Sequence, residues 1–444
     1  MNTPAPLQQF RQAVYASLRQ RADATLDLLD ALTVAGHVES PVALSEQPLF
    51  RRQFSGVYDV LAEAALDPQQ LAQVLYEAQP RDSDTLAGYE VYAVDTTPTA
   101  RPAAETLADR GQWKKGQAEP VQVGHKYSWL ARLVTVGTSW VAPQAVCRVP
   151  SATTDSKAAV GQVQALDQRS PRPKVVVADS LYGNVVFLAV CLVVTTVAVL
   201  VRLRHNIVLY EQPQPQPAGR KGAPRKHGPK FKLAQPGRPP DRQEEFSLLS
   251  QQVRLSAWHG LHFYKLPALI GMVLRVEFLK DDGTPRYQRP LWLFWTGPWA
   301  VPLPDLCRMY LWRFGLEHAF RFLKQHLGLN ANQSTQPHST ELWMWLCALA
   351  YWQLLLMRSD VAVHRPAWYP QRQGAETTPL TPGLVQRGAL CFLLELGTPA
   401  AAPKRTGKGP GRPQGYRPAP RPRYAVVKKA ARRPKVTRKV AVQT

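Results

Sequence analysis

The pattern of apolar and polar residues changes near residue 89. The preceding residues carry apolar side chains at helical spacing, most clearly over residues 8–33, which contain no proline. Residues 89–94 (YEVYAV) instead alternate in the way that is typical of a strand. Residues 125–137 and 139–150 continue the strand pattern and predict a hairpin. We therefore expect a helical region followed by a sheet.

Helices and strands interleave after this hairpin. Residues 157–168 predict a helix, and residues 174–178 (KVVVA) form the continuous apolar run of a strand buried in a sheet. Interleaving of this kind indicates an α/β sheet covered by helices. Residues 185–201 contain no charge over 17 positions, the lower limit for crossing a bilayer. We interpret them as a buried helix leading into a buried strand, with a membrane span as the alternative.

The second half of the chain changes character twice. Residues 212–242 are rich in Pro, Gly, Lys and Arg and predict a flexible basic loop. Strand-like runs at residues 268–279 and 290–294 then predict a β-rich insertion. An amphipathic helix is expected over residues 305–327, and an apolar, tryptophan-rich helix over residues 340–357.

These changes predict five segments along the chain. The first three are a helical N-terminal domain (residues 1–88), the first part of an α/β core (residues 89–204) and a basic loop with the β-rich insertion (residues 205–302). The last two are the remaining core helices (residues 303–360) and a Pro-rich, basic, largely disordered C-terminal tail (residues 361–444).

Charge points to a polyanionic partner. The 444 residues contain 55 Lys plus Arg against 32 Asp plus Glu, a net charge of +23, which favours nucleic acid as the partner. Residues 401–444 hold 14 of these cations and no acid, so they are either a solvated tail or a non-specific phosphate clamp. Residues 1–88 are net negative, with 6 Arg, no Lys and 11 acids, and form no obvious DNA-binding surface.

Cysteine usage favours a reducing compartment. The five cysteines include no CxxC pair, which argues against a disulfide framework and against a zinc site. The first ten residues lack the basic and apolar segments of a secretory signal. We expect a cytoplasmic protein associated with the nucleoid, with no small-molecule substrate.

Two aspartates follow apolar strands. Asp95 ends the first strand (VYAVDTT), and Asp179 ends the buried run (VVVADSLYG). Either residue alone is as consistent with a turn or a helix cap as with a functional site. If neighbouring strands hold both, however, their repulsion requires a cation, and hard oxygen ligands select Mg²⁺ or Mn²⁺.

A third acid lies within the amphipathic helix. Tyr310, Arg313, Glu317 and Lys324 are spaced by three, four and seven residues, so at about 100° per residue they share one face of the helix. A carboxylate there can ligate a metal, while Arg and Lys hold phosphates. The alternative is a solvated face with an i,i+4 Arg–Glu pair.

These residues resemble the signature of a known family. The pattern Tyr310-x2-Arg313-x3-Glu317-x6-Lys324 is similar to the Tyr-Arg-Glu-Lys (YREK) signature of one superfamily of bacterial insertion-sequence DDE transposases. Asp95 and Asp179 resemble the two aspartate motifs of that superfamily, 84 residues apart. The spacing of 138 positions from Asp179 to Glu317 leaves room for the β-rich insertion that such transposases carry.

The resemblance implies both a fold and a reaction. The fold is RNase H-like, and the reaction is hydrolysis of a DNA strand followed by strand transfer. Two divalent ions, Mg²⁺ or Mn²⁺, held by Asp95, Asp179 and Glu317, would assist an in-line displacement. A homodimer would join two DNA ends in a synaptic complex and move the element by cut-and-paste, through a hairpin intermediate.

The resemblance also implies DNA contacts. Tyr310, Arg313 and Lys324 would hold the strand near its cleaved end, and an aromatic residue of the insertion would stack on a flipped base. Trp292, Trp295 and Trp299 are the candidates, with core packing as the alternative for each. A catalytically inactive DNA-binding relative and a general nuclease remain as other interpretations of the whole chain.

Overall fold

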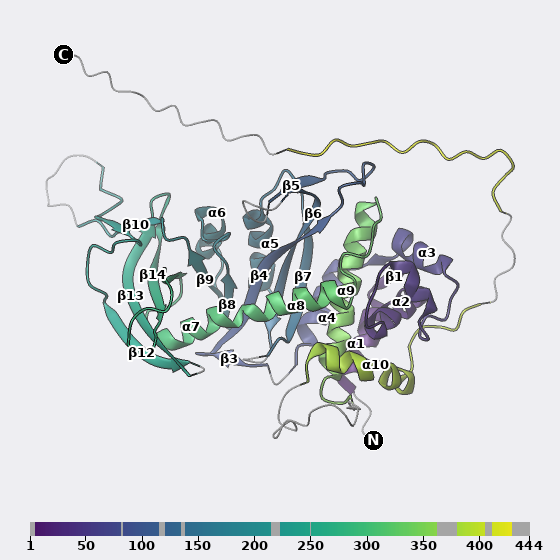
Figure 1. Cartoon of the computed structure of the whole chain (residues 1–444), viewed down its shortest axis with the longest axis horizontal. Coiled ribbons are helices and arrows are strands. Elements are labelled where there is room, and N and C mark those ends of the chain that lie inside the picture. The colour runs from purple at the N-terminus through teal and green to yellow at the C-terminus, as the bar shows by residue number, and fades with distance from the viewer. Residues whose placement is uncertain are drawn as a thin grey trace, which may run out of the picture.

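One large sheet runs through the molecule and has helices on both faces (Figure 1). The computed structural model describes residues 5–80, 83–114, 120–134, 138–214, 223–248, 250–361, 380–404 and 411–428. Within these residues the sheet has 13 strands, and a second, two-stranded sheet lies among the N-terminal helices.

The half of the sheet that carries the aspartates has its strands in the order β7-β6-β4-β8-β9. In this half β4, β8 and β9 are parallel to one another, whereas β6 and β7 are antiparallel to their neighbours. The hairpin of β6 and β7 confirms the pairing expected from the sequence, although residues 135–137 lie outside the described chain. The strands are β3 (Thr85–Leu86), β4 (Tyr89–Ala100), β5 (Gly111–Trp113), β6 (Gln122–Leu133), β7 (Val141–Val149), β8 (Lys174–Ala178) and β9 (Val197–Leu203).

The insertion continues the same sheet. Its strand β15 pairs antiparallel with β9, so the hydrogen-bond ladder passes from the core into the insertion without a break. The strands are β10 (Val208–Glu211), β11 (Lys230–Lys232), β12 (Arg242–Leu248), β13 (Gln251–Phe263), β14 (Leu266–Phe278) and β15 (Leu291–Trp295). Because β11 pairs with β10, the expectation of a flexible loop over residues 212–242 is wrong for residues 230–232; residues 215–222 lie outside the described chain.

Side chains of the central strands alternate between two cores. Along β4, Val91 and Ala93 join the core beneath the N-terminal helices, whereas Tyr92 and Val94 join the core on the opposite face. All four side chains have no exposed surface, as expected for strands covered on both sides. Helix α5 (Asp155–Asp167) covers the second face through Ala159, Val163 and Leu166.

The uncharged run at residues 185–201 has the structure that its pattern predicts. It forms α6 (Val185–Leu188), the 3-10 helix η2 (Ala189–Leu192) and most of β9. Asn184 begins α6 by accepting hydrogen bonds from the backbone N–H groups of Val186 and Phe187. In the described part of the chain, no helix combines the length and the apolar character needed to cross a membrane.

The N-terminal region is mainly helical, as expected, but its first predicted helix is interrupted. Arg21 has φ 55°, in the left-handed region, so the chain turns there and separates α1 from α2. The elements are α1 (Ala5–Ala16), β1 (Leu18–Gln20), α2 (Ala22–Val34), η1 (Pro41–Glu46), α3 (Ser55–Glu63), β2 (Ala65–Leu66) and α4 (Pro68–Glu77). The apolar α9 (Pro337–Met357) packs against α2, α3 and β7.

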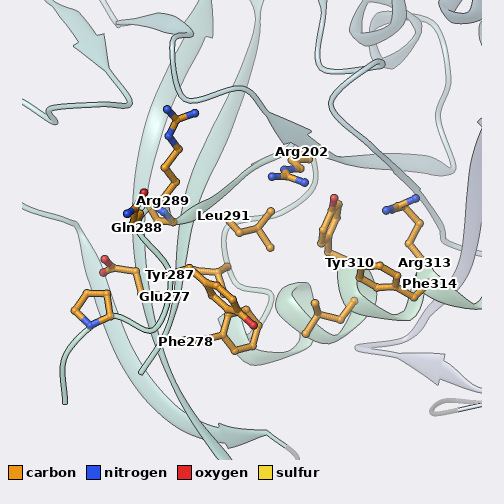
Figure 2. Close-up of a pocket in the computed structure, with 14 residues that line it drawn as sticks. Arg202, Glu277, Phe278, Tyr287, Gln288, Arg289, Leu291, Tyr310, Arg313 and Phe314 are labelled. Atoms are coloured by element: carbon orange, nitrogen blue, oxygen red, sulfur yellow. The ribbon is translucent and has the colours of Figure 1, made fainter. Parts of the chain in front are cut away.

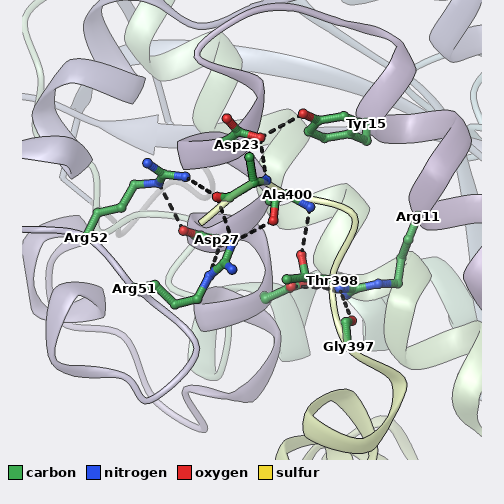
Figure 3. Close-up of polar contacts among 11 residues, drawn as sticks. Arg11, Tyr15, Asp23, Asp27, Arg51, Arg52, Gly397, Thr398 and Ala400 are labelled. Atoms are coloured by element: carbon green, nitrogen blue, oxygen red, sulfur yellow. Dashed lines mark hydrogen bonds and ion pairs between the residues drawn. The ribbon is translucent and has the colours of Figure 1, made fainter. Parts of the chain in front are cut away.

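The C-terminal region contains more structure than a disordered tail. Helix α10 (Pro382–Leu396) packs on α2 and α9, because Val385, Ala389 and Leu393 recur every four residues on one buried face. Residues after this helix cross the N-terminal helices, where Arg51 and Arg52 donate to the carbonyl oxygens of Ala400 and Ala401 (Figure 3). The expectation of disorder is therefore wrong for residues 380–404. Residues 405–410 and 429–444 lie outside the described chain.

Candidate active site

The two aspartates lie at the same level of neighbouring parallel strands. Val94 of β4 pairs in register with Ala178 of β8, so Asp95 and Asp179 occupy the next position on each strand. Gly183 lets the loop after Asp179 lie against β9, since a Cβ atom there would come within 2.5 Å of the Arg202 carbonyl oxygen. The two positions are therefore adjacent, as expected, but only Asp179 follows the end of its strand. The expectation that Asp95 ends the first strand is wrong, because β4 continues to Ala100 through its pairing with β6.

The helix that carries Glu317 is divided in two. The single helix expected over residues 305–327 is instead α7 (Leu303–Trp312) and α8 (Phe314–Gln325), which meet at Arg313 (Figure 1). Around the junction the hydrogen bonds shorten to three residues, with the Arg313 N–H donating to the Tyr310 carbonyl and the Leu316 N–H to the Arg313 carbonyl. Leu316 and Ala319 pack into the core.

Arg313 connects the helix to the strand ends. Its Nη2 lies 2.7 Å from Glu317 Oε1, and its Nη1 lies 3.8 Å from Asp95 Oδ2. The Arg313 side chain is 6% exposed, whereas that of Glu317 is 43% exposed. The guanidinium therefore lies between two acids that come from different parts of the fold, and it supplies the positive charge that offsets their repulsion.

Asp95 is held in an unfavourable environment for its charge. Burial, together with the negative charges of Asp179 and Glu317, raises the pKa of Asp95 to about 7. The Thr96 backbone N–H, 2.7 Å from Asp95 Oδ1, and the Arg313 guanidinium act in the opposite direction. A buried acid that repels its neighbours is typical of a functional site rather than of a structural ion pair.

A pocket of about 580 Å³ opens beside Arg313, although none of the three acids lines it. Figure 2 shows Tyr310, Arg313 and Phe314 on the helix side and Tyr287 and Arg289 on the insertion side. Tyr287 is 59% exposed and Phe314 is 46% exposed, so both rings are available to a ligand. The combination of guanidinium groups and open aromatic faces is suited to a phosphate that carries a planar base.

The other residues expected to bind DNA lie further from the acids. Lys324 is half-buried on α8, seven residues beyond Glu317, which corresponds to about 10 Å along a helix axis. Trp292 and Trp295 are 2% and 0% exposed on β15, and the Trp295 indole donates to the Pro298 carbonyl. Trp299 is half-buried and packs against Arg242. This burial favours the core interpretation of Trp292 and Trp295 over base stacking.

Two residues of the pocket were missed by reasoning from sequence. Arg202 lies on β9 at the level of Asp179, because Ala178 pairs with Val201. Its position just after a buried parallel strand was a signal of the same kind as that of the aspartates. Tyr287 gave no such signal, since it lies in a polar turn whose approach to α7 depends on the tertiary fold.

The donor atoms are suited to a divalent cation, although they are not gathered around one point. Asp95, Asp179 and Glu317 supply carboxylate oxygens, which hard divalent cations prefer, and the charges of Asp179 and Glu317 add to burial in raising the pKa of Asp95. Among the described residues, no three His, Cys, Asp or Glu side chains are grouped closely enough to hold one ion. The contact between Arg313 and Glu317 is the interaction that a cation would replace.

The mixed sheet and the converging carboxylates define a protein of the DDE-nuclease type. The chain belongs to the DDE superfamily endonucleases, whose family model matches residues 13–262, more than half of its length. The matched residues include Asp95 and Asp179 and end before Glu317. A comparison with curated proteins gave no match. Membership makes the protein a transposase-like nuclease with DNA as its substrate.

Proposed function

We propose that the protein is a transposase of an insertion sequence that cleaves DNA ends with Mg²⁺ or Mn²⁺ and transfers them by cut-and-paste. The proposal rests on the adjacent positions of Asp95 and Asp179 on β4 and β8. It rests also on Arg313, whose guanidinium contacts both Glu317 and Asp95. The strand order β7-β6-β4-β8-β9, with β4, β8 and β9 parallel, supports an RNase H-like core.

Asp95, Asp179 and Glu317 would hold two divalent cations. Such ions supply charge that lowers the pKa of the attacking water or 3′-hydroxyl and stabilises the leaving oxygen. The chain contributes the placement of three oxygen donors on two strands and one helix. The Asp95 side chain is 20% exposed, so a ligand can reach it, while its partly buried surroundings strengthen electrostatic interactions at the site.

Arg313 would exchange partners when DNA binds. Its guanidinium can leave the carboxylates once cations neutralise them, and it can then donate to a phosphate beside the scissile bond. Tyr310, whose ring lies under the Arg313 guanidinium at 5.6 Å, would orient that exchange. Lys324 would hold a phosphate further along the strand. We place the flipped base against Tyr287 and Phe314 rather than Trp295, because their rings are exposed.

The central test replaces the three acids by their amides. Asp95→Asn, Asp179→Asn and Glu317→Gln should each lower Mg²⁺-dependent nicking of a DNA end by at least about a thousandfold, since each removes a charged donor. DNA binding measured by gel shift should persist. Retained nicking in a variant would remove that residue from the site.

Asp167→Asn is the matched control for these variants. Asp167 accepts hydrogen bonds from Thr195 and Thr196 at the amino end of β9, so it is an acid at the opposite end of the same strands. Its variant should keep nicking activity. If the unmodified protein binds DNA ends but never nicks them in Mg²⁺ or Mn²⁺, the alternative of a catalytically inactive DNA-binding relative is favoured instead.

We propose further that two copies join two DNA ends in a synaptic complex, working on nucleoid DNA in the cytoplasm. The net charge of +23 supports a DNA-bound state. A single-end substrate should therefore be bound without strand transfer, and paired ends should be required for insertion into target DNA.

A further inference from the structure

A basic, aromatic surface lies on the insertion, away from the carboxylates. We define the distal patch as Tyr210, Lys226, His227, Lys230, Lys232 and Tyr264. Its residues come from β10, β11, the segment that precedes β11 and the turn after β13. In the sheet order, five strand spacings separate β10 from β8, which corresponds to roughly 24 Å along the sheet.

Strand register puts the cations of the patch on one face. Leu209 pairs with Phe231, and both are fully buried. The alternating positions are therefore turned outward, and there Tyr210 pairs with Lys230 while Val208 pairs with Lys232. Both lysines are exposed.

Stacked rings hold the neighbouring segment in place. The His227 ring lies 4.5 Å from the Tyr264 ring and 5.1 Å from the Tyr210 ring, centroid to centroid. His227 Nδ1 and His262 Nε2 are 2.9 Å apart, which joins the segment to β13. The Gly228 N–H also donates to the Glu211 carbonyl, so the backbone next to Lys226 is held against β10.

Acids do not neutralise this surface. Residues 223–232 contain Arg225, Lys226, Lys230 and Lys232 and no acid. Glu211 is the one acid of β10 and β11, and its Oε1 lies 3.4 Å from Arg238 Nε. Tyr264 is 59% exposed beside these lysines and presents a hydroxyl that can donate to a phosphate.

We infer that the distal patch binds the phosphate backbone of duplex DNA, outside the base pairs that reach the carboxylates. The inference rests on the proposed function, since it extends the DNA-binding surface of the same enzyme. The lysines would contact successive phosphates, and Tyr264 would fix their position on the duplex. A duplex advances 3.4 Å per base pair, so the patch contributes only when the DNA continues about seven or more base pairs beyond the cleavage site.

The test compares two double variants of equal charge. Lys230→Gln with Lys232→Gln removes cations from the patch, whereas Lys114→Gln with Lys157→Gln removes exposed cations elsewhere. Binding is measured by fluorescence anisotropy on two duplexes of arbitrary sequence. The short duplex has about 5 base pairs on each side of its midpoint, and the long duplex has about 20.

The patch variant should bind the long duplex roughly tenfold more weakly at moderate salt and show a salt slope lower by one to two, since each phosphate contact contributes about 0.9. Its binding to the short duplex should equal that of the control variant. Tyr264→Ala should weaken long-duplex binding a few-fold with an unchanged slope. Equal affinities and slopes for the two double variants on the long duplex would overturn the inference.

The outcome is separable from that of the proposed function. The patch variant should still nick the short duplex, and this nicking should still depend on Asp95. Loss of the long-duplex effect would refute the patch while leaving the catalytic proposal intact. Nicking that survives Asp95→Asn would refute the catalytic proposal while leaving the binding comparison interpretable.

Discussion

Two places in the molecule bring a buried arginine against an aspartate, which is buried in one place and partly exposed in the other, and they differ in how completely the charges are paired. Beneath the N-terminal helices, Arg11 forms an ion pair with Asp30 and also donates to Gln353 Oε1. It donates to the Gly397 carbonyl as well (Figure 3). Gln353 in turn donates to Asp30 Oδ1. Every contact in this network joins a donor to an acceptor.

At the strand ends, pairing is incomplete. Arg313 Nη1 is 3.8 Å from Asp95, too far for a hydrogen bond, and Arg313 Nε has no hydrogen-bond partner among the described residues. Asp95 also faces Asp179 and Glu317, which repel it. The difference indicates that the first network serves stability, whereas the second keeps unsatisfied charge for a ligand at a cost in stability.

The largest expected effect is on the first network. Arg11→Met should lower the free energy of unfolding by about 3–5 kcal/mol, because it leaves Asp30 buried without its partner. Urea denaturation followed by circular dichroism measures the loss. Nicking per folded molecule should not change.

Arg313→Met provides the contrast to Arg11→Met. It should impair DNA cleavage while costing clearly less stability, since its contact with Asp95 is long and Glu317 is 43% exposed. Equal losses of stability in the two variants would contradict the conclusion that the Arg11 network serves stability and the Arg313 network does not.

A smaller effect concerns pH. The pKa of Asp95 is raised to about 7 in the folded protein, above its ordinary value of 3.8, so the folded state binds a proton more readily than the unfolded state. Stability contributed by this group is complete below about pH 4 and falls as pH rises through about 7. The loss amounts to about 4 kcal/mol at most, at 1.36 kcal/mol per pH unit.

Asp95→Asn removes this titration. In a metal chelator, the variant should be more stable than the unmodified protein at pH 8, and the two should converge near pH 4. Denaturation midpoints across this range provide the measurement. Parallel profiles would show that Asp95 is not held in a repulsive environment.

The pocket beside Arg313 allows a further test, in which the loss of a DNA contact is compared with the loss of stability. Tyr287→Ala should weaken processing of a DNA end by about 1–3 kcal/mol, the range for loss of one aromatic stacking partner, while stability stays nearly unchanged because the ring is exposed. Tyr287→Phe should retain most of the activity. A matching loss in Tyr416→Ala, which removes another exposed ring remote in sequence, would indicate a general effect instead.

The sequence predicted elements whose pattern is local. Residues 174–178 were expected as a strand, and β8 has those bounds. A short, continuous run of β-branched residues is typical of a strand that is buried on both faces. The adjacent placement of Asp95 and Asp179 also followed from alternating strands and helices, whereas the continuation of β4 to Ala100 did not, because it depends on pairing with β6. These features depend on neighbours in sequence.

What could not be predicted depends on tertiary contacts. The break at Arg313 has no proline to mark it, and the nearby Gly315 alone does not predict it, while the burial of Trp295 depends on contacts such as that with Tyr89. The residues near 215–222 and 429–444 are basic and apolar-poor, so pattern alone assigns them no partner. Helix α10 was missed because its surroundings are rich in proline and cations.

The smallest expected effect concerns the C-terminal segment. Two truncations there compare the contributions of residues 411–428 and of residues 429–444 to DNA binding. Within residues 411–428, the N–H groups of Tyr424 and Val427 donate to the carbonyls of Glu105 and Arg110, so part of the basic segment is attached to the core. Truncation after residue 428 removes 6 cations, and truncation after residue 404 removes 13. Both retain Ala400 and Ala401, which Arg51 and Arg52 bind.

If the cations of residues 429–444 bind DNA and those of residues 411–428 do not, the shorter deletion should already account for most of the change in salt slope, and the longer one should add little. Both deletions should lower non-specific affinity by a few-fold. The shorter one should leave the unfolding free energy unchanged, whereas the longer one should lower it slightly, because it also removes the hydrogen bonds of Tyr424 and Val427 to the core. A slope that changes in proportion to the 6 and 13 cations removed would instead mean that the attached residues 411–428 contribute as much per cation as residues 429–444.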